Sequence, residues 1–188
     1  MTGGWYAVRA PRVEDADEVG RVHIQVWREA YVEQMPDDFL EALDPVKSAE
    51  RWRLRLEVDE PDGIVVVATG RDGEIVGIAS AGPTRDQDAP TEWELYSINV
   101  LAAHHGSGVA NQLITAAVAE RPATLWVFRD NPRADAFYRR HGFTVEGATR
   151  IHEGTGVTEL RMIRNNVTPA AGKPARLNRE RPQGSLPG

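Results

Sequence analysis

Residues 94–110, ELYSINVLAAHHGSGVA, run from an apolar strand through a turn with two glycines into a helix that begins with small residues. Consecutive backbone N–H groups at such a helix N-terminus form an anion site of the size of a pyrophosphate. The turn and the start of the helix consist of His105, Gly106, Ser107, Gly108, Val109 and Ala110. The same glycines also suit a plain tight turn with left-handed backbone angles. The turn alone therefore leaves two interpretations open.

On both sides of this stretch, apolar periodicity and turn residues predict alternating strands and helices. Val19, Val22 and Val26 recur at helical steps, and Arg71-Asp72-Gly73 is typical of a hairpin. The expected strands are 6–10, 64–69, 74–81, 92–100, 124–128, 143–148 and 157–163, and the expected helices are one from residue 13 to about residue 30, then 38–43, 46–58, 107–120 and 131–141. This order predicts a mixed sheet with helices on its faces.

A second informative block, NPRADAFYRRHGF at residues 131–143, follows the expected strand 124–128. Together the two blocks resemble the GNAT superfamily of acetyl-CoA-dependent N-acetyltransferases. The family's phosphate loop reads [QR]-x-x-G-x-[GA], with which residues 105–110 are in register. Its later block reads N-x-x-A-x-x-F-Y-x-x-x-G-F, which residues 131–143 match throughout. His105 stands where the family usually has Gln or Arg.

The resemblance implies an α/β (α+β) fold. Its sheet would be mixed and mostly antiparallel, with six to seven strands flanked by helices and splayed between the fourth and fifth strands. It also implies acetyl-CoA as co-substrate. The pantetheine arm would pair like an added strand with Ile98, Asn99 and Val100, and the pyrophosphate would lie on the turn 105–110. Further cofactor contacts are expected from Asn131, Ala134, Phe137 and Tyr138.

The same resemblance implies the catalytic groups. The Tyr138 hydroxyl would lie near the thioester sulfur, where a phenol can donate a proton to the departing thiolate. An ammonium has no lone pair, so a base is also needed. Glu94 lies where many relatives carry a glutamate that acts through water, and Glu92, which is expected on the same strand face, is the alternative.

An aromatic group near the N-terminus is the candidate acceptor site. Trp27 and Tyr31 are four residues apart and share a helix face, and Phe39 and Trp52 follow within 26 residues of Trp27. With Glu92 and Glu94, these aromatic residues suit an amine through cation–π attraction, although ordinary core packing explains them equally well. The expected acceptor is a primary amine of a small molecule. A protein or peptide amine is the alternative.

Composition and charge limit the remaining classes. The 188 residues contain 22 Lys and Arg, 28 Asp and Glu, and no Cys, which gives a net charge of −6 and removes disulfides and thiol nucleophiles. The Pro- and Gly-rich segment 165–188 has four basic residues and one acidic residue, and it is expected to be a flexible tail of charge +3. The domain 1–164 is then at −9 (−6 minus +3), which leans toward a cationic acceptor.

Four other interpretations are weaker. The five histidines lack ligand spacing, so no metal is expected. Gly106 and Gly108 suit a dinucleotide site, but Asn111 replaces its third glycine. A non-catalytic acyl-CoA sensor would not need Tyr138. Nucleic-acid binding through the tail is weakly supported, because no aromatic residue lies among its basic residues.

With no signal peptide or membrane span predicted, a cytoplasmic protein is expected. Dimers are frequent in this fold, so a homodimer is the expected assembly.

Overall fold

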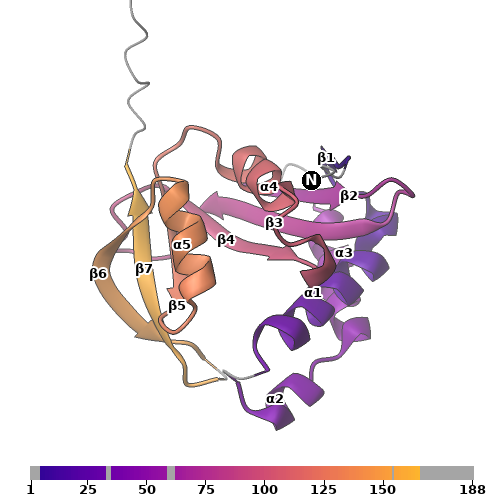
Figure 1. Ribbon diagram of the computed structural model, residues 1–188, viewed down its shortest axis with the longest axis horizontal. Coiled ribbons are helices and arrows are strands. Elements are labelled where there is room, and N and C mark those ends of the chain that lie inside the picture. Colours follow the sequence, from indigo (N-terminus) through magenta and orange to yellow (C-terminus); the bar gives the residue numbers. More distant parts are fainter. Residues whose placement is uncertain (1–4, 33–34, 59–61, 154, 166–188) are drawn as a thin grey trace, which may run out of the picture.

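The computed structural model describes residues 5–32, 35–58, 62–153 and 155–165, in which seven strands form one sheet (Figure 1). The strand order is β1-β2-β3-β4-β5-β7-β6, and every neighbouring pair is antiparallel except β4–β5. The expected mixed, mostly antiparallel sheet is confirmed. The strands are β1 Ala7–Arg9, β2 Ile64–Thr69, β3 Ile75–Pro83, β4 Trp93–Val100, β5 Ala123–Phe128, β6 Thr144–Ile151 and β7 Thr158–Arg164.

Helices lie where the periodicity predicted them. They are α1 Ala16–Ala30, α2 Asp37–Glu41, α3 Pro45–Leu56, α4 Val109–Val118 and α5 Pro132–Arg140, with short 3₁₀ segments at Val13–Asp15 and Ala102–His104. Strand β6 extends three residues beyond its expected end at Ala148, because a bulge at 146–148, with Gly147 at φ +120°, interrupts the pairing and the strand then resumes. None of the helices in the described ranges is long and apolar enough to cross a membrane. Apart from Asn165, the expected tail lies outside the described residues.

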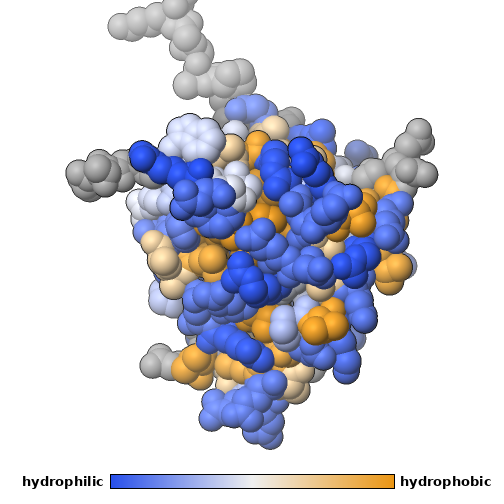
Figure 2. Space-filling model, turned by 90° about the vertical axis from the view of Figure 1, so that its right-hand side faces the viewer, coloured by the Kyte–Doolittle hydropathy of each residue, from blue (hydrophilic) through white to orange (hydrophobic). Residues whose placement is uncertain are grey.

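Helices α1 and α3 pack against each other and against one face of the sheet. Val19, Val22 and Trp52 join Val67 and Ile78 in a buried cluster there. Gly20 permits the close crossing, since a Cβ at this position would come within 2.9 Å of the Ala49 Cβ. Hydrophilic side chains cover much of the outer surface on this side of the molecule (Figure 2).

Helix α4 covers the opposite face of strands β1 to β4. Its buried side chains Leu113, Ile114 and Ala117 belong to the main core with Leu95 and Leu125. Tyr138 of α5 and Phe143 extend the same core toward β5. Strand β4, which lines the site, is therefore contacted by α4 on one face and by α1 on the other.

The sheet opens between β4 and β5, as expected from the sequence. Only Glu94 with Thr124 and Leu95 with Leu125 are paired across this boundary. On the other edge of β4, Ser97 pairs with Ser80 and Leu95 with Ala81, so Tyr96 is an extra residue of a β-bulge. A bulge bends its strand, and here it lies where β4 parts from β5. The β5-facing edge of β4 beyond Leu95 is therefore left without a ladder partner.

Candidate active site

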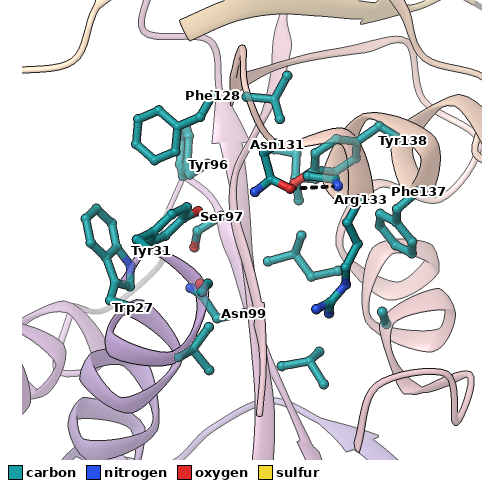
Figure 3. Close-up of a pocket in the computed structure, with 18 of the residues that line it drawn as sticks. Trp27, Tyr31, Tyr96, Ser97, Asn99, Phe128, Asn131, Arg133, Phe137 and Tyr138 are labelled. Atoms are coloured by element: carbon teal, nitrogen blue, oxygen red, sulfur yellow. Dashed lines mark hydrogen bonds between the residues drawn. The ribbon is translucent and has the colours of Figure 1, made fainter. Parts of the chain in front are cut away.

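A cleft of about 960 Å³ lies at the opening between β4 and β5, and it is lined from both sides of the sheet (Figure 3). One half is formed by α5 and the glycine turn after β4. The other half is formed by α1, α3 and the ends of β5 and β7. In Figure 3, Asn131, Arg133 and Tyr138 lie on one side of β4, and Trp27 and Tyr31 lie on the other.

The glycine turn has the backbone geometry of an anion cradle. Gly106 and Gly108 have φ of +75° and +90°, and nothing lies within 4 Å of where a Cβ would project from either. Within the described residues, the N–H groups of Gly106, Gly108 and Ala110 have no backbone or side-chain acceptor. Three backbone donors at the start of α4 are therefore without a described protein acceptor, beside two glycines that leave the space around them open.

His105 departs from the expected cradle. Its backbone N–H donates to Ala102, and the N–H of Ser107 donates to His104. The His105 ring turns back to the end of β4, where Nε2 lies 2.8 Å from the Val100 carbonyl oxygen. Burial lowers the pKa of this imidazole. The cradle is therefore narrower than the six consecutive N–H groups expected from the sequence.

The expected strand edge faces the cleft at Ile98, Asn99 and Val100. Asn99 is 7 % exposed, and its Nδ2 has no hydrogen-bond partner among the described residues. A buried amide that lacks an acceptor is costly. This donor is consequently suited to a ligand oxygen.

Asn131 serves two purposes at the start of α5. Its Oδ1 caps the helix by accepting the Ala134 N–H at 3.0 Å, which leaves the Nδ2 as the free side of the amide, turned toward β4 in Figure 3. Arg133, which the sequence analysis missed, lines the same half. The proximity of its charge helps to lower the pKa of His105. Arg133 could have been identified from the sequence as a basic residue in the first turn of the helix that follows the expected strand 124–128.

Tyr138 lies in the wall of the cleft and packs against Phe137 and Phe143, with ring centroids 5.4 and 6.1 Å away. Its hydroxyl has no hydrogen-bond partner among the described residues. Burial, and to a lesser extent the nearby Tyr31, raises the pKa of this phenol well above its usual range. The phenol is therefore protonated at neutral pH, and its hydroxyl has no described protein acceptor to compete with a ligand.

Aromatic side chains enclose the other half. Trp27 and Tyr31 are in edge contact at 5.3 Å, and Tyr31 contacts Phe128 at 5.1 Å. Phe39 packs against Trp27 but does not line the cleft, whereas Trp52 does. Burial, helped by Glu159, raises the pKa of Tyr31 to about 12. Trp27 and Tyr31 thus line the cleft, and their role as acceptor contacts stays a prediction.

The structure does not bring Glu94 or Glu92 into the cleft. Glu94 is 1 % exposed, and its carboxylate is held by the backbone N–H and the guanidinium of Arg85. Glu92 is exposed just before β4. Neither carboxylate lines the cavity, so the geometry gives no support to a base or an acceptor contact at either position.

Several other titratable groups of the cleft were missed, among them His152 and Glu159. His152, between β6 and β7, packs against Phe128 and Trp27 with centroids 5.4 and 6.1 Å away, and its Nδ1 lies 2.9 Å from Thr155 Oγ1. Glu159 of β7 is buried and paired with Arg150. Both are more than 110 residues from α1, so no local motif links them to it. Among the described residues, no group of His, Asp or Glu is arranged to hold a metal ion.

The profile of the acetyltransferase (GNAT) family matches residues 24–143. A curated relative, the uncharacterized N-acetyltransferase YuaI of Bacillus subtilis, is 27% identical over 172 residues, which cover 84% of this chain and 95% of the relative. Among solved structures, the PaiA N-acetyltransferase of Thermoplasma acidophilum in complex with coenzyme A has a TM-score of 0.66 at 16% identity and covers 86% of this chain and 99% of its own. A phosphinothricin acetyltransferase of Sinorhizobium meliloti in complex with AcCoA has a TM-score of 0.63 at 21% identity, with coverages of 91% and 94%.

Proposed function

The chain belongs to the acetyltransferase (GNAT) family, and from that premise we propose that it transfers an acetyl group from acetyl-CoA to a primary amine of a small molecule, by direct attack in a ternary complex. One observation carries the proposal. The unpaired edge of β4 faces Asn131 and Tyr138 across a single cleft, and a glycine cradle lies at the end of the strand.

The cofactor half fits acetyl-CoA in three respects. The open cradle at Gly106 and Gly108, with Arg133 nearby, suits the pyrophosphate. The free edge at Ile98 and Val100 suits the amides of the pantetheine arm in the manner of an added strand. The Asn131 Nδ2, left over from the helix cap, suits a carbonyl of that arm.

Acetyl-CoA supplies a thioester whose carbonyl carbon the amine nitrogen attacks. Tyr138 supplies the proton for the departing sulfur, because the phenol is protonated at neutral pH and lines the cleft with its hydroxyl free of a described protein partner. A protein nucleophile is not needed for direct attack. The aromatic wall of Trp27, Tyr31 and Phe128 holds the acceptor and keeps water from the thioester.

We assign removal of the amine proton to His152. Its ring packs against Trp27 and Phe128 in the acceptor half, and an Nδ1–H donated to Thr155 leaves the Nε2 lone pair available. His23 also lines the cleft, but its Nδ1 accepts the Trp52 indole N–H at 3.2 Å, so the neutral ring holds its proton on Nε2. Glu94 is occupied by Arg85.

Calorimetric titration with acetyl-CoA tests the cofactor site. Gly108→Ala puts a methyl group into the cradle, and Gly73→Ala is the matched control. Gly73 also has a positive φ, +85°, and open space around an added Cβ, but it lies in the β2–β3 turn outside the cleft. We expect Gly108→Ala to weaken acetyl-CoA binding at least tenfold and Gly73→Ala to leave it within twofold.

If the protein binds acetyl-CoA and releases CoA with peptides but with no small amine, the acceptor is a protein or peptide amine. If it binds acetyl-CoA and releases CoA with neither class of acceptor, the domain is a sensor. Equal loss of affinity in the two glycine variants, or no binding to the unaltered protein, would overturn the proposal.

A further inference from the structure

The charge inside the cleft is opposite to the charge of the domain. Five arginines line the cleft, namely Arg55, Arg85, Arg133, Arg140 and Arg150. The only acidic residues in the lining are Glu29 and Glu159, and no lysine or aspartate lines it among the described residues. Such a lining favours an anionic ligand more than the −9 charge of residues 1–164 suggests.

Two of these arginines are paired within the protein, and two others lie beside the proposed cofactor site. Arg85 pairs with Glu94, and Arg150 pairs with Glu159. Arg133 and Arg140 belong to α5, beside the half proposed for acetyl-CoA and its phosphates. Arg55 differs from both groups: no described carboxylate lies within 4.0 Å of its guanidinium, and it belongs to α3 and not to α5.

Arg55 is held at the acceptor end of the cleft by two aromatic rings. Its guanidinium carbon lies 5.5 Å from the Trp52 ring centroid and 5.7 Å from that of Tyr96. The Arg85 guanidinium lies 4.3 Å from the same Tyr96 ring. Two cations therefore flank the bulge residue of β4. Burial lowers the pKa of Arg55, and the neighbouring Arg85 lowers it further, so a bound anion would relieve an unfavourable position.

The phosphates of acetyl-CoA do not account for this cation. Tyr96 and Val100 are four residues apart on β4, about 13 Å along a strand, and the glycine cradle begins only beyond Val100. Arg55 also comes from α3, across β4 from α5. It therefore lies at the end of the cleft opposite the cradle, on the side where the acceptor enters.

We propose that Arg55 binds a carboxylate of the acceptor, so that the substrate is an amino-acid-like amine carrying both an amino and a carboxylate group. This inference rests on the function proposed above. A planar guanidinium forms two parallel hydrogen bonds with a carboxylate, and the cation–π contacts with Tyr96 and Trp52 restrain its position. With the carboxylate at Arg55, the side chain of the acceptor packs on Trp27, Tyr31 and Phe128, which favours apolar amino acids.

The test measures CoA release with matched acceptors. L-phenylalanine, L-leucine and L-methionine are compared with their amides and with the amines that lack the carboxylate, using the unaltered protein, Arg55→Gln, Arg55→Lys and Arg71→Gln. Arg71 is an exposed arginine of the β2–β3 turn, so its variant controls for the loss of one positive charge. Acetyl-CoA binding is titrated in parallel for each protein.

We expect kcat/KM to be at least tenfold higher for one or more of the amino acids than for its amide. Arg55→Gln should remove this preference through a raised KM, Arg55→Lys should restore part of it, and Arg71→Gln should retain it. Acetyl-CoA affinity should stay within twofold in all variants. If the unaltered protein binds acetyl-CoA but shows no preference in kcat/KM for amines that carry a carboxylate, this inference alone is overturned. The same holds if the preference is retained in Arg55→Gln. Absence of acetyl-CoA binding by the unaltered protein would overturn the proposed function itself.

Discussion

Arg85 encloses the Glu94 carboxylate: its backbone N–H lies 3.0 Å from Oε2, and its guanidinium contacts both carboxylate oxygens. Glu94 is the second residue of β4, and Arg85 lies in the loop after β3. The pair therefore closes the β3–β4 connection onto the strand. The Arg85 guanidinium also lies over Tyr96, so this contact fixes the bulge beside the acceptor half.

Glu94→Gln should destabilise the fold without changing the pH dependence of catalysis. The amide cannot accept from three donors as the carboxylate does, and because Arg85 is half exposed and can turn to solvent, we expect a loss of about 1–3 kcal/mol in the free energy of unfolding. Urea unfolding and a pH–rate profile measure the two effects. Glu92→Gln, at an exposed position, is the control. A hundredfold loss of rate with unchanged stability would instead make Glu94 the base.

His152→Gln should lower kcat/KM by about a hundredfold, the usual contribution of one general base. The change removes the cleft-lining imidazole that we assign to proton removal, while the aromatic wall of Trp27 and Phe128 remains. Acetyl-CoA affinity is expected to stay constant, because His152 belongs to the acceptor half. His141→Gln is the matched control, since that histidine does not line the cleft and lies against Asn111 and Phe137, away from the acceptor half. Equal rates for the two variants would exclude His152 as the base.

Tyr138→Phe isolates the proton donor. It keeps the packing against Phe137 and Phe143 and removes only the hydroxyl. We expect kcat to fall about 10²-fold, with the acetyl-CoA dissociation constant within twofold and thermal stability nearly unchanged. Tyr6→Phe removes a hydroxyl that contacts His104 and does not line the cleft, so it should leave kcat unaffected. A full rate in Tyr138→Phe would remove this group from the mechanism.

Asn131→Asp and Asn131→Ala separate the two uses of this amide. Asp retains an oxygen for the Ala134 N–H, so the cap remains, but it lacks the Nδ2 donor and should weaken acetyl-CoA binding about tenfold at nearly constant stability. Ala loses the cap as well, which should cost about 1 kcal/mol of stability. Unfolding curves and titrations of both variants are compared. An Asp variant that binds acetyl-CoA as tightly as the unaltered protein would contradict the cofactor contact.

The helices and turns of the fold could be predicted because the residues that specify each of them are close together in the sequence. Apolar spacing located α1, and the Pro and Asn residues at the start of α5 set its first turn. The glycine turn after β4 was identified because Gly106 and Gly108 adopt backbone angles that other residues disfavour. The mostly antiparallel sheet and the opening beside β4 were predicted from the resemblance to a family.

The acceptor half was less predictable because its residues come together only in the tertiary structure. Arg55 meets Tyr96 across 41 positions, and His152 meets Trp27 across 125. No spacing rule links such residues. Glu94 shows the reverse problem: its position on β4 suggested a base, but the Arg85 contact that occupies it depends on the conformation of the β3–β4 loop.

His23 makes the stability of the domain depend on pH. Burial, with a smaller contribution from the charge of Arg51, lowers its pKa to about 4, whereas an unfolded histidine titrates near 6.5. Between these values the unfolded chain binds the proton and the folded chain does not, so stability is present above pH 6.5 and is lost as the pH falls toward 4. We expect about 2 kcal/mol less stability at pH 5 than at pH 7 from this residue. Urea unfolding at both pH values, compared with His23→Gln, measures it. Gln can still accept the Trp52 indole N–H but does not titrate, so an unchanged pH dependence in that variant would contradict the assignment.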